Sequence, residues 1–489
     1  MKQNMRSLVQ NSGILVIANS SIKVITFLLM PLYTRVLDAA DYGVTDTIIN
    51  LAQLVLGAFS LCIDWGMTAF FYDEDKESYR VKLTTSGTVF CILSTLACLS
   101  MMVFSKPISL LLFHSPDYAW AVALGFVYAG LKLSYFAFRV STRMRGQMKQ
   151  VALFSMAELL SLLIMNILLI LVFRVGYMAV LYANVISQVV CGGLYLLGNR
   201  KWVKPKSYDG ALLKRVLRYS IPLTPTVLLT WFNSFADRYI IGQFHDQTAV
   251  GLYGRAFQIV TMLSVLTSSF LAAYPSFAFS NASDEKKRPQ YAMVYDGMVA
   301  VLGILAAFAT LFAKDIFVIM TDPSYHSAYL AVGLLCFGHV FYTLGNVMGY
   351  GITVQKNGKL FLLVNASGAV CNLILNLLLV PTKLGFMGSA ITSCSAQLIV
   401  MLVSRHFGEK LFRCNYRVIR SLILLFAIGG ICYAGGELVF WWKLPVLLGV
   451  IGLVVLVYRK QIPMVLAMLR RKAPKEEPEP VDENEATEQ

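Results

Sequence analysis

Charged residues are scarce in this sequence, and their scarcity decides its class. Only 14% of the 489 residues are Asp, Glu, Lys or Arg, whereas 57% are hydrophobic, and the mean hydropathy is +0.65. A typical soluble domain is about one quarter charged, so this chain is far too apolar to be surrounded by water. The composition therefore excludes a soluble protein and predicts one that lies mostly in a lipid bilayer.

Residues that build catalytic and metal centres are also sparse. The five histidines show no metal-ligand spacing, and the nine cysteines imply no disulfide framework. The sequence has no phosphate loop, nucleophile elbow or catalytic triad. The longest predicted outer loops, 105–118 and 314–326, are too short for the catalytic loop of a membrane polymerase or ligase. We therefore expect no enzyme activity, no metal and no cofactor.

Long apolar runs are frequent, and each is long enough to cross a bilayer. The first six lie near residues 11–33, 44–66, 84–104, 119–138, 151–173 and 176–198. Six more lie near residues 219–242, 250–274, 291–313, 327–349, 359–381 and 385–404, and two follow near 417–437 and 442–458. The sequence therefore predicts an all-α membrane protein with 14 transmembrane helices, arranged as 6 + 6 + 2.

Short motifs indicate that the two sets of six are a duplication. Residues 174–179 (RVGYMA) recur as residues 383–388 (KLGFMG), and the Asp-x4-Gly segment 38–43 is matched by segment 246–251. Each copy of the first motif also has an upstream Asn and a downstream Gln, namely Asn166, Gln188, Asn376 and Gln397. Duplicated membrane units are typical of transporters, so the pattern predicts two six-helix lobes related by a parallel repeat.

The cations are divided unequally between the two sides of the predicted membrane. The predicted outer loops hold only Arg35, Lys106, Arg174, Lys314, Lys383 and Lys443. Most of the other Lys and Arg lie in the inner segments, which predicts cytoplasmic termini. The net charge of +15 then reflects topology and contact with anionic lipid rather than nucleic-acid binding.

These features divide the chain into five segments. We expect an N-lobe over 1–200, a basic cytoplasmic linker over 201–218, a C-lobe over 219–406, two final helices over 407–460 and a tail over 461–489. The end of the tail is rich in Pro and Glu, which predicts a disordered cytoplasmic segment.

Two pairs of opposite charges fall at equal depth on neighbouring predicted helices. Lys132 and Glu158 lie toward the inner side, and Asp237 and Arg255 toward the outer side. Ionisable groups in hydrocarbon normally face a partner or a water-filled cavity. Each pair is therefore either a structural ion pair or part of the transport path, in which Glu158 or Asp237 would exchange a coupling ion.

Three more ionisable residues fall within predicted helices. Lys23 lies near the middle of the first one with no acid at matching depth, which indicates an anion-accepting cavity or an ion pair with Glu158. Arg238 lies about 100° around its helix from Asp237, so we expect it to reach the hydrated outer interface. His339 is either a hydrogen-bonded core residue or a proton carrier.

Three segments resemble the signatures of bacterial polysaccharide transporters. They are residues 31–37 (PLYTRVL) followed by 41–43 (DYG), residues 220–225 (SIPLTP), and residues 237–241 (DRYII) running on to 249–253 (AVGLY). Over about residues 5–460 the chain resembles the lipid-linked oligosaccharide flippases (Wzx type) of the multidrug/oligosaccharidyl-lipid/polysaccharide exporter superfamily.

The resemblance implies a MATE-like fold in which the two lobes enclose a V-shaped central cavity and the last two helices pack outside. It also implies a function: transfer of an undecaprenyl-diphosphate-linked oligosaccharide across the bacterial cytoplasmic (inner) membrane, for O-antigen, capsule or exopolysaccharide assembly, by alternating access. A cationic cavity suits the diphosphate, and we would assign that role to Lys23 first, then to Arg255 and Lys132. The implied partners are the lipid-linked substrate, membrane lipids, a polysaccharide polymerase and a chain-length regulator.

Two other kinds of transporter compete with this interpretation. An ion-coupled multidrug exporter of the same superfamily would share the fold but prefer an acidic, cation-binding cavity, whereas the most deeply placed charge here is Lys23. A twelve-helix facilitator would carry a Gly/Asp/Arg-rich loop after its second helix, and residues 67–80 (MTAFFYDEDKESYR) lack one.

Overall fold

The structure is a computed structural model that describes residue 27 and residues 30–74, 76–281, 288–354 and 358–459. Most of the first predicted span, including Lys23, and all of the tail lie outside these residues. The described residues form helices joined by turns, and they include no strand.

The N-terminal half forms one bundle, which we call the N-lobe. Its helices are α2 (Met30–Val36), α3 (Ala39–Ser60), α4 (Ile63–Phe70), α5 (Glu77–Ser100), α6 (Ser105–Phe113), α7 (Ala119–Ser134), α8 (Phe136–Met144), α9 (Met148–Ile167) and α10 (Met178–Asn199). The predicted span 44–66 is in fact two helices, because Leu61 and Cys62 adopt left-handed conformations between α3 and α4. There the hydroxyl of Ser60 accepts from the backbone N–H of Cys62 at 3.4 Å.

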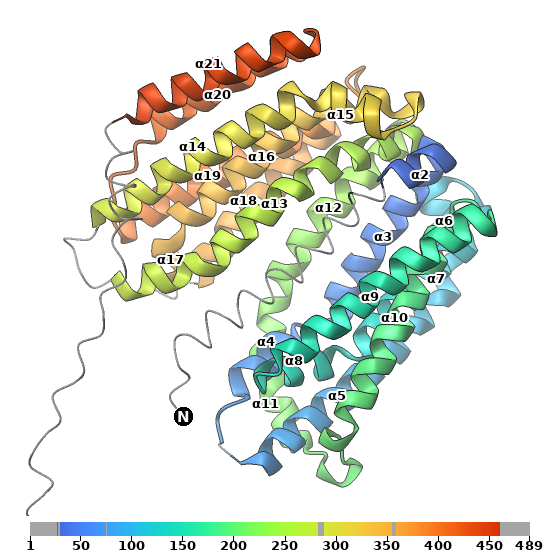
Figure 1. The fold of residues 1–489 in the computed structure, drawn as a ribbon. Helices are drawn as coiled ribbons and strands as arrows, with labels where there is room; N and C mark the ends of the chain where they lie inside the picture. Colours follow the sequence, from blue (N-terminus) through green and yellow to red (C-terminus); the bar gives the residue numbers. More distant parts are fainter. Residues whose placement is uncertain (1–26, 28–29, 75, 282–287, 355–357, 460–489) are drawn as a thin grey trace, which may run out of the picture.

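The C-terminal half forms a second bundle, the C-lobe. Its helices are α12 (Thr224–Phe244), α13 (Gln247–Asn281), α14 (Arg288–Leu311), α15 (Ala313–Met320), α16 (Tyr329–Met348), α17 (Tyr350–Val354), α18 (Gly358–Leu379) and α19 (Phe386–Leu411). Two further helices, α20 (Val418–Gly435) and α21 (Phe440–Tyr458), pack against α14 at the edge of the C-lobe away from the N-lobe (Figure 1).

The membrane fold class is confirmed. Within the described residues, 12 helical segments are long and apolar enough to cross a membrane, and each overlaps a predicted span. In addition, α12 occupies the seventh predicted span. The total of 14 stays a prediction because the first span lies mostly outside the described part of the chain.

The predicted repeat has a structural counterpart at its two glycines. Gly176 and Gly385, which lie in the turns before α10 and α19, have φ values of +70° and +53°. Only glycine adopts this region without strain, which explains why both copies of the motif carry it.

The segment between the lobes is tied to the N-lobe. It contains α11 (Gly210–Ser220), which packs against α4, and a Cβ on Gly66 would lie only 2.7 Å from the Val216 side chain. The Ser86 hydroxyl also accepts from the backbone N–H of Asp209 at 3.0 Å. This linker therefore packs on α4 and α5.

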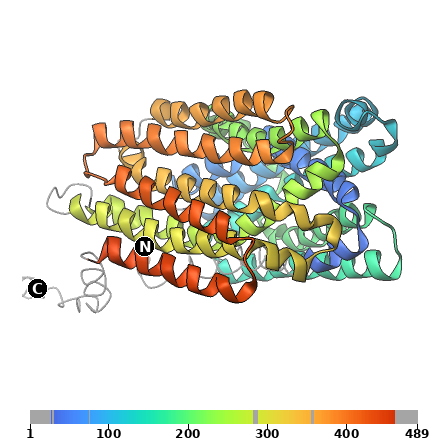
Figure 2. The same ribbon diagram turned by 90° about the horizontal axis from the view of Figure 1, so that it is seen from above.

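The two lobes converge at one end and diverge at the other. In Figure 1 the N-lobe meets the C-lobe near α2 and α3, whereas α4 and α17 lie far apart at the opposite end. The lobes meet where α3 of the N-lobe packs against α12 and α13 of the C-lobe. The view from above in Figure 2 shows the last helices on the far side of the C-lobe from the N-lobe.

Candidate functional site

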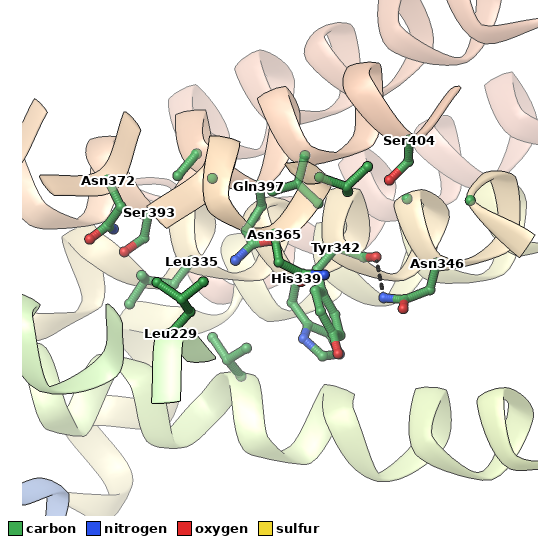
Figure 3. Close-up of a pocket in the computed structure, with 18 of the residues that line it drawn as sticks. Leu229, Leu335, His339, Tyr342, Asn346, Asn365, Asn372, Ser393, Gln397 and Ser404 are labelled. Atoms are coloured by element: carbon green, nitrogen blue, oxygen red, sulfur yellow. Dashed lines mark hydrogen bonds between the residues drawn. The ribbon is translucent and has the colours of Figure 1, made fainter. Parts of the chain in front are cut away.

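The best-defined cavity lies inside the C-lobe, among α12, α13, α16, α18 and α19. Its volume is about 330 Å³. Asp237 and Arg238 line it, and the rest of its polar lining consists of His339, Tyr342, Asn346, Asn365, Asn372, Ser393, Gln397 and Ser404. Figure 3 shows that these side chains come from both sides of the cavity, with Asn372 and Ser393 at one end and Ser404 at the other.

Glycines on α16 bring one wall of the cavity close to α19. A Cβ on Gly338 would lie 3.1 Å from the Cα of Cys394, and a Cβ on Gly345 would lie 3.2 Å from the Cα of Met401. Small residues let membrane helices approach each other this closely. The cavity therefore has a tightly packed frame around its polar side chains.

Asp237 stands at the end of the cavity marked by Ser393. Its side chain is 5% exposed and accepts hydrogen bonds from the Tyr253 hydroxyl (2.8 Å), the Asn376 amide (2.8 Å) and the Ser393 hydroxyl (3.0 Å). These three neutral donors satisfy the hydrogen-bonding capacity of the buried carboxylate. The repeat motif had singled out Asn376, but nothing in the sequence linked it to Asp237.

The predicted pair of Asp237 and Arg255 is wrong. Arg255 is fully buried, its guanidinium lies 3.3 Å from the centre of the Tyr42 ring, and it donates to Gln258 at 2.7 Å. Tyr33 and Tyr325 surround the same guanidinium at 5.3 and 5.8 Å. Cation–π contacts with three tyrosines take the place of a carboxylate partner.

The expectation for Arg238 is also wrong. Its side chain is 4% exposed rather than hydrated, and its Nε donates to Asp46 Oδ2 at 2.9 Å. Asp46 lies on α3, so this ion pair joins the two lobes. Matching depths on adjacent helices could not find it, because its members are 192 residues apart in the chain.

Further contacts close the same end of the molecule. The Tyr325 hydroxyl donates to the backbone carbonyl oxygens of Leu37 (2.9 Å) and Asp38 (2.6 Å). The Gln243 amide donates to the carbonyl oxygen of Leu111 at 2.8 Å. Together with Arg255 and the Arg238–Asp46 pair, these contacts form what we call the closed end, which the cation distribution predicts to be the outer one.

The predicted pair of Lys132 and Glu158 is not formed either. Lys132 Nζ donates to the Tyr128 hydroxyl at 3.2 Å, and Glu158 accepts from the Gln188 amide at 2.9 Å. Gln188 accepts in turn from the Tyr135 hydroxyl at 2.6 Å. Within the described N-lobe, both charges are therefore half-buried and held by neutral groups.

The remaining predicted residues have different outcomes. Lys23 lies outside the described residues. His339 lines the cavity, and its Nε2 forms a hydrogen bond with the Thr267 hydroxyl at 2.8 Å. This contact agrees with the interpretation of His339 as a hydrogen-bonded residue, and its role as a proton carrier stays a prediction. The described residues contain no cluster of three His, Cys, Asp or Glu side chains that would hold a metal ion.

The solved structures similar to this chain include membrane transporters. The chain is similar to a lipid II flippase MurJ in an inward closed conformation, with a TM-score of 0.69 and 13% identity, covering 91% of this chain and 99% of that one. It is also similar to an inward-facing multidrug resistance MATE family transporter of the MOP superfamily, with a TM-score of 0.60 and 15% identity, covering 80% and 97% of the two chains. At these identities the likeness establishes the fold: this chain has the fold of MOP-superfamily transporters.

Family models identify the chain more closely. The model for the polysaccharide biosynthesis protein family matches residues 8–281, which is more than half of the chain, and the MatE model matches residues 222–378. The chain therefore belongs to the polysaccharide biosynthesis protein family. No curated protein matches it.

Proposed function

We propose that this protein is a flippase that carries an undecaprenyl-diphosphate-linked oligosaccharide across the bacterial cytoplasmic membrane. The observation that carries the proposal is the chemistry of the C-lobe cavity, where amide, hydroxyl and imidazole groups line the open space together with Asp237 and Arg238. Such groups both donate and accept hydrogen bonds, as sugar hydroxyls require. The family membership of the chain supports the same class of substrate.

The splayed arrangement of the lobes suits entry of cargo from one side. The closed end blocks passage beyond Arg255, while the lobes diverge at the end that is predicted to be cytoplasmic (Figure 1). In the proposed cycle the glycan enters between the lobes, the closed end opens, and the prenyl chain stays in lipid. A polysaccharide polymerase and a chain-length regulator would act on the product at the opposite membrane face.

The diphosphate requires cations, and three are proposed to supply them. Lys23 is the first candidate. Lys132 is suitable because its hydrogen-bond partner is the Tyr128 hydroxyl rather than a carboxylate. Arg255 would reach substrate only after its tyrosine cluster separates, since it is fully buried while the closed end is formed.

Ion coupling is proposed for Asp237 first and Glu158 second. Asp237 lines the cavity beside Ser393 and sits next to Arg238, whose ion pair joins the lobes. Binding of a proton or a sodium ion at Asp237 would therefore alter hydrogen bonds in the C-lobe and the adjoining contact between lobes. Glu158 is held by Gln188 in the N-lobe and would act through that lobe alone.

Transport of a fluorescent lipid-linked oligosaccharide into proteoliposomes tests the substrate assignment. Lys23→Ala should reduce flipping at least about tenfold, because one lost charge–phosphate contact costs about 1.4 kcal/mol or more. Lys82→Ala, at an exposed position on α5, is the matched control. Full transport by a correctly inserted Lys23→Ala protein would remove Lys23 from the site.

An imposed ion gradient tests the coupling assignment in the same vesicles. Asp237→Asn should abolish the response of flipping to a proton or sodium gradient, and Asp117→Asn, at an exposed position, should keep it. If Asp237→Asn and Glu158→Gln both left the gradient response unchanged, neither acid would be the coupling site.

Multidrug export is the alternative function, supported by the MatE match over residues 222–378. Its specific expectation is ion-driven efflux of cationic drugs that depends on Asp237. Cells that express the protein should show no such efflux if the cargo is a lipid-linked glycan. Glycosyltransferase and polymerase genes next to the gene of this protein would also favour the flippase over the drug exporter.

A further inference from the structure

A groove opens on the outside of the C-lobe, along α20 and α21. Its volume is about 620 Å³, and its apolar lining comes from Ile419, Ile423, Leu424, Ala427, Leu453 and Val457. Ile419 and Ile423 are 69% and 66% exposed. Since α20 and α21 lie at the edge of the molecule in Figures 1 and 2, this groove faces the surrounding lipid.

One end of the groove is strongly cationic. Arg405, Arg417 and Arg420 line it. Arg405 pairs with Glu409 at 3.6 Å, whereas Arg420 stacks on the Tyr458 ring at 4.9 Å. Within the described residues, neither Arg417 nor Arg420 has a carboxylate partner, and residues 410–420 (KLFRCNYRVIR) carry four cations and no acid. The groove therefore has a net positive charge at one end, where Glu409 balances only one of the three arginines, and apolar side chains along its length.

The first turn of α20 adds to this positive end. The helix begins at Val418, and Arg417 at its N-cap makes no side-chain capping bond. The first amide groups of a helix and its dipole favour a bound anion, and a phosphate group is well suited to such a position. Three arginine side chains and the start of α20 thus line the same end of the groove.

We propose that this groove binds an anionic phospholipid, whose phosphate contacts Arg405, Arg417 and Arg420 and whose acyl chain lies along Ile419, Ile423 and Leu453. Basic pockets at the cytoplasmic side of transmembrane helices are suited to anionic headgroups. The occupant is a membrane phospholipid rather than the transported cargo, because α20 and α21 pack on α14 and lie away from α3, α12 and α13, which meet between the lobes. The lipid acts as a fixed structural partner of the C-lobe.

Native mass spectrometry of the full-length protein, titrated with phosphatidylglycerol or phosphatidylcholine, tests the proposal. Phosphatidylglycerol should bind in preference, and the double variant Arg417→Gln/Arg420→Gln should weaken its binding about 30-fold, taking about 1 kcal/mol per arginine. Lys410→Gln/Arg413→Gln is the matched control, since it removes the same charge from the same segment outside the groove. Ile423→Trp should also weaken binding by filling the groove while keeping all three arginines.

Four outcomes would overturn the proposal. Equal binding of phosphatidylcholine would remove the role of the arginines, and equal losses in the two double variants would reduce it to general surface charge. If truncation after Arg459 created lipid binding that the full-length chain lacks, the occupant would be the chain's own C-terminal segment. If inorganic phosphate bound as tightly as phosphatidylglycerol in the same titration, the acyl groove would play no part in binding.

Discussion

Gly43 on α3 and Gly251 on α13 face each other across the two lobes. A Cβ on Gly43 would lie 1.9 Å from the carbonyl oxygen of Gln247, and a Cβ on Gly251 would lie 1.9 Å from the carbonyl oxygen of Ala39. These are the two glycines of the repeated Asp-x4-Gly segments, whose aspartates each accept a hydrogen bond from a backbone N–H at the start of the next helix. The repeat therefore brings two matching helix starts into backbone contact at the closed end.

Replacing either glycine should open the closed end. Gly43→Ala or Gly251→Ala forces the helices apart, because a well-packed contact accepts an added carbon only at a cost of about 1–3 kcal/mol. Spin labels at exposed positions 114 and 322 would report a longer distance between the lobes. Gly297→Ala, where an added Cβ meets nothing within 4 Å, should leave that distance unchanged. An unchanged distance in both glycine variants at the closed end would contradict this role.

The Arg238–Asp46 pair should be strongly coupled. Asp46→Asn leaves a buried guanidinium without its carboxylate, which we expect to lower the free energy of unfolding by about 3 kcal/mol or more. Asp46→Leu combined with Arg238→Met should cost less than either single change, since no unpaired charge remains. Thermal unfolding of the four proteins in a double-mutant cycle measures the coupling. Additive effects would mean that the two groups do not act as a pair.

Arg255 offers a test that separates stability from transport. Two of its guanidinium nitrogens, Nε and Nη2, have no hydrogen-bond partner within the described structure, so Arg255→Met should change stability by no more than about 1 kcal/mol. Transport should fall at least about tenfold if the charge contacts the diphosphate in a later state of the cycle. Tyr42→Phe keeps the aromatic ring and should retain both properties. Normal transport by Arg255→Met would limit Arg255 to packing at the closed end.

The contact of Glu437 with α15 and α16 should make stability depend on pH. Glu437 accepts hydrogen bonds from Lys314 and from the Tyr329 hydroxyl, and the bond from Lys314 is the largest cause that holds the pKa of this carboxyl below its usual value. A depressed folded-state pKa adds stability above the unfolded-state pKa, and that stability is lost as the pH falls through the folded-state pKa. Melting temperatures at pH 7 and at about pH 3.5 should therefore differ more in the native protein than in Glu437→Gln. Equal differences would show that Glu437 contributes nothing to the acid dependence.

Depth along a helix could be read from the sequence, but rotation about the helix axis could not. Asp237 and Arg255 do lie on neighbouring helices, yet Asp237 faces Asn376 and Ser393, while Arg255 faces Tyr42. A helix in hydrocarbon has an apolar surface on nearly every side, so its sequence gives little information on which face turns inward. The side-chain partners of Asp237, Arg238 and Arg255 were missed for this reason. The most distant of them, Asp46, belongs to the other lobe.

The sequence by itself determined the membrane class, the positions of the helices and the twofold repeat. Hydrocarbon imposes these features, because every spanning segment must be long, apolar and internally hydrogen-bonded. Only the tertiary structure decided which charges meet, since that depends on how the helices turn and on where the lobes touch. Arg238 therefore pairs with Asp46, Arg255 is enclosed by tyrosines, and Lys132 and Glu158 are held by neutral groups.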